Sequence, residues 1–136
     1  MSDWRNPWSR HYQSTWMERA GNRSLPDWLR VAAAAYGSHK ANGHAMFGRG
    51  DLACLLARVN PETGEMACLD RRHVYRAIEL AVEYGWLAPG STARCLIVPG
   101  HAVSGGIGNP TDVCPQHVKA AAKAKATRPD LKVVGA

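Results

Sequence analysis

The stretch from Leu69 to Leu87 constrains the fold of this 136-residue chain more than any other segment. Asp70 is suited to cap the first turn of a helix, and Gly85 can adopt the left-handed conformation that ends one. The apolar side chains between them recur at the spacing of one buried helical face, and they are Val74, Ala77, Ile78, Ala81 and Val82. The sequence therefore predicts an amphipathic helix with one face in a hydrophobic core.

The outer face of this helix is basic first and acidic last. Arg72 and Arg76 lie opposite the apolar stripe, and Glu79 and Glu83 continue the same face toward the C-terminus. The helix macrodipole favours the reverse order, by roughly 0.3 kcal/mol or more per charge. Two interpretations remain open: an external polyanion meets the arginines, or the arginines pair with the glutamates on a solvated face.

A β-hairpin is predicted directly after the helix. Residues 86–88 are a short apolar run, 89–92 are the turn-forming sequence Pro-Gly-Ser-Thr, and 93–98 are a second apolar run that Pro99 closes. With its helix, hairpin and Gly85-Trp86-Leu87 step, the chain resembles winged helix-turn-helix DNA-binding proteins over residues 24–99. It is also similar to small helix-turn-helix proteins of actinobacterial phages, in segments 25–32, 36–44 and 114–117.

This resemblance implies sequence-specific binding of double-stranded DNA by a phage or bacterial transcriptional regulator. Arg72, Tyr75 and Arg76 would enter the major groove, Arg71 and His73 would lie near the phosphate backbone or groove edge, and Ser91 and Arg94 would lie on the wing. The alternative is a protein-interaction module, in which the wing and the N-terminal helix form a homodimer or bind a host or phage protein. No paired catalytic carboxylates, phosphate loop or oxyanion motif indicates an enzyme, and no small-molecule substrate is evident.

The fold expected is mainly α with a small β-hairpin wing, an extra N-terminal helix and a basic C-terminal tail. Within residues 1–23, Asn6 and Pro7 indicate a helix over 7–20, whose stripe of Trp8, Tyr12 and Trp16 we expect to pack on the main domain rather than stack on nucleic acid. Within residues 24–99, we expect helices over 27–36 and 51–59, with a short strand at 45–47 between them. The connection over 60–69 is longer than in a compact helix-turn-helix.

Residues 100–118 form a Gly-rich segment that contains part of a potential metal site. Cys95, His101, Cys114 and His117 are a suitable ligand set for one structural zinc ion, which would order this segment. In the other interpretation Cys95 is a buried strand residue and His101 an ordinary loop residue. Cys54 and Cys68 show no metal spacing, and we expect them to be separate packing thiols.

The composition fits one compact domain followed by a basic tail over residues 119–136. The net charge is +6 and the pI is near 9.5, which favours an acidic partner such as nucleic acid. No apolar run is long enough for a membrane span, and no signal peptide is recognisable. We therefore expect a cytoplasmic protein that has no membrane partner and whose cysteines are thiols or metal ligands rather than disulfides.

Overall fold

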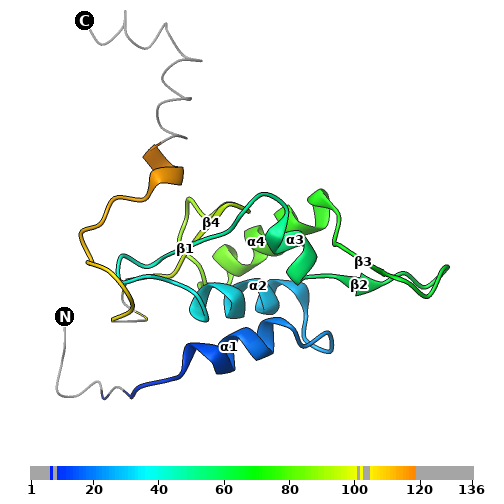
Figure 1. Ribbon diagram of the computed structural model, residues 1–136, viewed down its shortest axis with the longest axis horizontal. Coiled ribbons are helices and arrows are strands. Elements are labelled where there is room, and N and C mark those ends of the chain that lie inside the picture. The colour runs from blue at the N-terminus through cyan, green and yellow to red at the C-terminus, as the bar shows by residue number, and fades with distance from the viewer. Residues whose placement is uncertain (1–6, 8, 101, 103–104, 119–136) are drawn as a thin grey trace, which may run out of the picture.

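The computed structural model describes residues 7, 9–100, 102 and 105–118 of the chain. Its elements, in chain order, are α1 (Gln13–Ala20), α2 (Asp27–Tyr36), β1 (His44–Met46), α3 (Asp51–Leu55), β2 (Arg58–Val59), β3 (Met66–Ala67), α4 (Arg71–Glu83) and β4 (Cys95–Ile97). The four strands form two separate two-stranded sheets, β1 with β4 and β2 with β3 (Figure 1). The structure is thus mainly helical with small antiparallel β elements.

Helix α2 lies at the centre, between α1 on one side and α4 on the other (Figure 1). Residues from Val31 to Ala35 are at most 1% exposed, so the helix is buried nearly all round. Its run of four alanines allows both neighbouring helices to approach closely. The remaining core is supplied mainly by α4, together with Leu52 of α3, Leu96 of β4 and Leu87, which follows the end of α4.

Helix α4 has the boundaries that its sequence predicts. The Asp70 side chain caps the first turn by accepting a 2.9 Å hydrogen bond from the backbone N–H of His73. At the other end Gly85 has a φ of 82°, in the left-handed region. The buried side chains of the helix are Val74, Ala77, Ile78 and Ala81, while Val82 is partly buried. The predicted inward face is confirmed.

Helix α1 is shorter than predicted, because it begins at Gln13 rather than at residue 7. Tyr12 has an extended backbone and an 83% exposed side chain, so it does not belong to a packed aromatic stripe. Trp16 does pack, with its ring 5.3 Å from that of Tyr36. Residues 9–11 are polar and exposed, so a longer helix would have little apolar surface to bury there. Asn6 and Trp8 lie outside the described residues.

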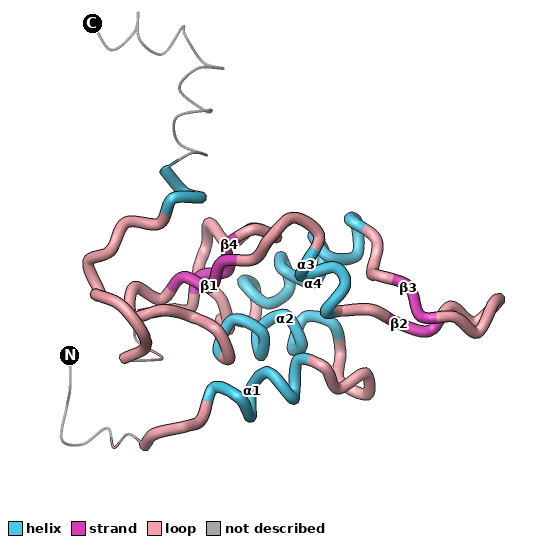
Figure 2. The backbone as a smooth tube through the Cα atoms, viewed as in Figure 1, coloured by secondary structure: helices cyan, strands magenta, loops and turns pink. Residues whose placement is uncertain are grey.

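Helix α3 ends at Leu55 instead of continuing to Val59, and a hairpin of β2 and β3 occupies the connection before α4. This hairpin extends away from the helices, at the end of the molecule opposite residues 105–118 (Figure 2). The pairing of Arg58 with Ala67 brings the two ends of the hairpin together. Cys54 and Cys68 consequently meet and form a disulfide, so the expectation of separate thiols is wrong.

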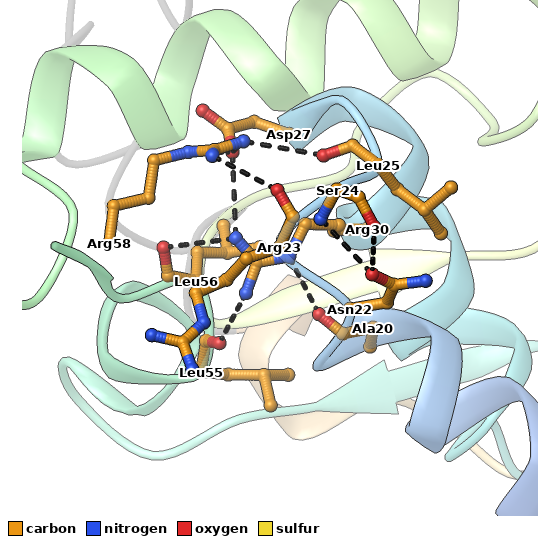
Figure 3. Close-up of polar contacts among 10 residues, drawn as sticks. All are labelled: Ala20, Asn22, Arg23, Ser24, Leu25, Asp27, Arg30, Leu55, Leu56 and Arg58. Atoms are coloured by element: carbon orange, nitrogen blue, oxygen red, sulfur yellow. Dashed lines mark hydrogen bonds and ion pairs between the residues drawn. The ribbon is translucent and has the colours of Figure 1, made fainter.

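A buried arginine connects the root of this hairpin to α1 and α2. Arg30, only 1% exposed, donates hydrogen bonds to the backbone carbonyls of Ala20, Leu55 and Leu56 (Figure 3). Burial lowers the pKa of its guanidinium. These carbonyls lie at the ends of α1 and α3, where no next turn is available to pair them. Arg30 therefore has a structural role that the helical pattern alone did not indicate.

The predicted wing is realised only in part. Residues 86–88 do not form a strand, because the backbone N–H groups of Trp86 and Leu87 donate to the carbonyl of Ala81 and close the end of α4. Strand β4 pairs instead with β1, with Cys95 opposite Met46 and Ile97 opposite His44. On its other side β4 is bonded to the chain before it at two places: Ala88 N–H donates to the carbonyl of Ile97 at 2.8 Å, and Thr92 and Cys95 exchange a pair of backbone bonds as an isolated antiparallel bridge. Within the described residues, no helix has the length and apolar character needed to cross a membrane.

Candidate metal centre and the basic face of helix α4

Four side chains with metal-ligating atoms meet beside the β1–β4 sheet: His44, Cys95, Cys114 and His117. One nitrogen or sulfur atom from each lies within 4.8 Å of the corresponding atoms of the other three. Both cysteines are buried and free of disulfide bonds. The cluster could therefore hold a metal ion.

The antiparallel pairing of β1 with β4 positions the first two ligands. His44 opens β1 and Cys95 opens β4, and the register places them at a diagonal across the sheet. His44 Nδ1 lies 3.3 Å from Cys95 Sγ. The backbone N–H of His44 also donates to the Asn42 side chain, which fixes the approach to the strand.

The other two ligands come from the segment of residues 105–118, which folds back onto the loop before β1. Ala41 N–H donates to the carbonyl of Ile107 at 2.9 Å, and the Asn42 amide donates to the carbonyl of Asp112 at 3.1 Å. Cys114 immediately precedes a helical turn over residues 115–118. One turn of helix brings residues three apart to the same side, so Cys114 and His117 both face the cluster.

Three of the separations within the cluster match those between ligands of one tetrahedral ion. Cys114 Sγ lies 3.5 Å from Cys95 Sγ and 3.3 Å from His117 Nδ1. In tetrahedral zinc sites, bonds of about 2.3 Å to sulfur and about 2.0 Å to nitrogen place neighbouring ligand atoms about 3.3–3.8 Å apart. These three pairs already have the spacing of zinc ligands, and all four ligand atoms lie within 4.8 Å of one another.

A hydrogen bond outside the cluster orients one imidazole. His117 Nε2 lies 2.8 Å from the carbonyl of Gly90, in the turn before β4. A carbonyl accepts only, so Nε2 carries a proton; Nδ1 can then donate to the Cys114 thiolate in metal-free protein or, once deprotonated, present its lone pair to a bound ion. Histidine ligands of metals are commonly fixed by such a bond from their second nitrogen. The same contact ties the helical turn over residues 115–118 to the predicted wing.

The two thiols differ in acidity. Burial raises the pKa of Cys95 to about 12. Burial also acts to raise that of Cys114, but hydrogen bonds from the His117 side chain and backbone outweigh it and lower the pKa to about 7. Burial lowers the pKa of His44, whereas the bond to Cys114 raises that of His117. One sulfur is therefore partly thiolate near neutral pH, and the other needs a cation to lose its proton.

Three of the four predicted ligands are in the cluster, and its fourth member among the described residues is His44. His101 lies outside the described residues. The sequence contains a signal for His44, because this residue directly precedes the strand predicted at 45–47. Its register was not predictable, and only the register shows that the residue at the start of the strand reaches the cysteine.

The predicted DNA-binding residues of α4 lie on its solvent side. Arg71, Arg72, His73, Tyr75 and Arg76 are all exposed. Arg76 pairs with Glu79 at 3.1 Å and His73 with Asp70 at 2.7 Å, while the Arg71 guanidinium lies 5.9 Å from the centre of the Tyr75 ring. Among the described residues, no carboxylate lies within 4.0 Å of Arg71 or Arg72.

The two predicted wing residues already have partners within the fold. The Ser91 hydroxyl donates to the carbonyl of Ala88 and accepts from the backbone N–H of Ile97. The Arg94 Nε donates to the carbonyl of Phe47, at 3.0 Å. Ser91 thus shapes the turn, whereas Arg94 is exposed and keeps its terminal nitrogens for another contact.

Comparison with known proteins places no further constraint on this site. No protein-family model matches the chain, and neither a curated protein nor a solved structure shows significant similarity to it. The fold and the two sites described above are therefore the basis for proposing a function.

Proposed function

We propose that the protein binds double-stranded DNA, as a phage or bacterial transcriptional regulator of the winged helix-turn-helix type. One structural zinc ion would hold the wing and the following segment in place. The observation that carries the proposal is the division of α4 into a buried apolar face and an exposed basic N-terminal half. A helix held rigidly by its apolar face can present the opposite face to the major groove.

The charges of this half favour an external anion. Arg71 and Arg72 have no carboxylate partner within 4.0 Å among the described residues, and they begin the helix, where the macrodipole adds to the positive potential. Arg76 does pair with Glu79, but both side chains are more than 60% exposed. Such exposed pairs are worth about 0–1 kcal/mol, so a phosphate or a guanine could replace the glutamate.

The element order also supports the proposal. A helix, a strand, two further helices and a strand follow each other as α2, β1, α3, α4 and β4. Winged helix-turn-helix proteins, which the sequence resembles, have this order with a second wing strand directly after the recognition helix, where residues 86–88 form none. The β2–β3 hairpin between α3 and α4 departs from the compact motif, and the acidic residues Glu62 and Glu65 near its tip would have to point away from the phosphates.

Zinc suits the metal cluster best among common ions. Two thiolates and two imidazoles are a soft to borderline donor set, which favours zinc over magnesium or calcium. Four protein ligands close a tetrahedral ion and leave no position for a substrate, as in structural rather than catalytic sites. The ion would join residues 114–117 to the paired strands β1 and β4.

The decisive test for DNA binding is enrichment of bound sequences from random duplexes, followed by affinity measurements at a stated salt concentration. Arg72→Ala with Arg76→Ala should abolish specific binding with little change in melting temperature. Arg10→Ala with Lys40→Ala removes the same charge from exposed positions away from α4, and it should leave the preferred sequence unchanged. Equal affinity of the α4 variant and the parent would show that α4 does not contact DNA.

The zinc component has its own measurement. Protein purified without chelator should contain close to one zinc ion per chain by elemental analysis, and Cys114→Ser should lower that content. His101→Ala should not lower it, since His44 supplies the fourth ligand. Full zinc content in a His44→Ala variant would contradict the proposed ligand set.

The exposed apolar side chains favour one second candidate, a protein-interaction module. Val59 and Met66 face each other across the β2–β3 hairpin and are 50% and 53% exposed. A cavity of about 340 Å³ between α1, α2 and the end of α4 is lined mainly by apolar groups, including Trp16, Leu29 and Trp86. If no duplex is enriched, sedimentation analysis of the purified chain tests the homodimer directly.

A further inference from the structure

We propose that Cys95 and Cys114 form a redox modification site. In metal-free protein, a hydroperoxide such as hydrogen peroxide converts the two thiols to a reversible disulfide. Disulfide and bound metal are mutually exclusive states of the cluster. The mutual exclusion of disulfide and metal rests on the proposed zinc site, whereas the formation of the disulfide does not.

The two sulfurs are already neighbours without being bonded. Their separation of 3.5 Å is about 1.5 Å more than a disulfide bond, so a small displacement closes the gap. Cys95 is fully buried and Cys114 is 6% exposed, so Cys114 is the sulfur that a small oxidant reaches first. Cys114 would therefore react with the oxidant, and Cys95 would then react with the oxidised Cys114 to form the disulfide.

The chain around Cys114 can supply the displacement. Cys95 belongs to β4, whose backbone is paired with β1. Cys114 instead lies in a segment held by three bonds: the backbone bond from Ala41 to Ile107, the side-chain bond from Asn42 to Asp112, and the bond between His117 and the carbonyl of Gly90. A segment with few anchors moves at lower cost than a paired strand.

The chemistry balances with the peroxide as oxidant. The Cys114 thiolate attacks one peroxide oxygen, the O–O bond breaks, and the products are a sulfenic acid and hydroxide, which takes up a proton to form water. The Cys95 sulfur then attacks the sulfenic sulfur, the S–S bond forms, and the sulfenic oxygen leaves as a second water. Each sulfur gives up one electron and the peroxide accepts both.

The disulfide removes the metal site. Only the thiolate form of cysteine is a strong metal ligand, and both thiolates are consumed when the bond forms. His44 and His117 remain, and two neutral imidazoles do not make a closed site. Conversely, a bound ion would occupy the lone pairs of both sulfurs and slow their attack on peroxide.

The chain contains an internal control for the oxidation. Cys54 and Cys68 already form a disulfide and are not in the cluster, so hydrogen peroxide should not change them. Trypsin cuts the chain after Arg58, between these two cysteines, so they appear as two peptides joined by their disulfide. Cys95 and Cys114 stay together in the peptide of residues 95–119, which contains no internal lysine or arginine.

In the test, the full chain is treated with hydrogen peroxide after metal is removed with a chelator. The remaining thiols are then alkylated, and the masses of the tryptic peptides are measured by mass spectrometry. The 95–119 peptide should lose both alkylation sites and weigh about 2 Da less than its dithiol form, and a small dithiol reductant should restore both sites. A Cys95→Ser variant should instead accumulate a sulfenic acid on Cys114 that a carbon nucleophile traps. Two alkylated thiols after treatment, or a Cys95–Cys114 bond found only between chains, would overturn the proposal.

Zinc then separates this proposal from the preceding one. Protein loaded with zinc should keep both alkylation sites under the same treatment, and the oxidised chain should bind zinc only after reduction. A chain that forms the disulfide but never binds zinc supports the modification site and overturns the zinc site. A zinc-loaded chain that oxidises as fast as the metal-free chain overturns the exclusion.

Discussion

Asp27 and Arg58 are 31 positions apart in the sequence and form an ion pair, with the Asp27 carboxylate accepting a 2.9 Å hydrogen bond from the Arg58 Nε (Figure 3). Arg58 also donates to the backbone carbonyls of Arg23 and Leu25. The first turn of α2 is thereby attached to the root of the β2–β3 hairpin. Together with Arg30 and the Cys54–Cys68 disulfide, this pair holds a protruding hairpin to the helical body.

Replacing the buried Arg30 should destabilise the protein strongly. Arg30→Met keeps most of the volume but leaves the carbonyls of Ala20, Leu55 and Leu56 without their donor. We expect a loss of about 3 kcal/mol in the free energy of unfolding, measured by urea denaturation. Arg49→Met, at an exposed position, is the matched control and should change stability by about 0.5 kcal/mol or less.

Removing the disulfide should also reduce stability, because the unfolded chain gains conformational entropy when the cross-link is absent. The bond joins residues 14 positions apart, and Cys54→Ser with Cys68→Ser should lower the free energy of unfolding by about 3 kcal/mol. Reductant should destabilise the parent by a similar amount and leave the double variant unaffected in metal-free protein. An effect of reductant on that variant would point to another disulfide.

Two aromatic residues near the start of α1 should behave differently. Trp16 packs on Tyr36 and on the core, so Trp16→Ala should cost about 2–3 kcal/mol in thermal or urea unfolding. Tyr12 is 83% exposed, and Tyr12→Ala should leave stability nearly unchanged. If Trp16→Ala melts like the parent and loses a binding partner, the ring belongs to an interaction surface.

The affinity for zinc should increase with pH. The Cys95 pKa of about 12 means that this thiol must release its proton on binding throughout the neutral range. Cys114, with a pKa of about 7, adds a second proton below neutrality, and His117, whose pKa is raised, contributes in the same direction. Competition with a chromophoric chelator from pH 6 to 8 should show at least about tenfold tighter binding per pH unit. Affinity independent of pH would exclude Cys95 from the ligand set.

The sequence by itself determined α4 in detail. Asp70, Gly85 and the apolar spacing between them act within a few residues, so local hydrogen bonding and one buried face fix the helix wherever it packs. The same local logic indicated α2 and three of the metal-ligating side chains. It failed at α1, because capping residues favour a helix start but cannot supply apolar contacts for exposed residues 9–12.

Only the tertiary structure decided which distant residues meet. His44 joins Cys95 through the register of β1 on β4, and Cys54 joins Cys68 because a hairpin closes the intervening chain. Both outcomes depend on strand pairing, between strands far apart in the sequence for β1 and β4 and within one hairpin for β2 and β3, and a shift of one residue in the β1–β4 register would turn His44 to the opposite face. Residue type and spacing show which side chains can bind a metal or form a disulfide, whereas strand pairing selects their partners.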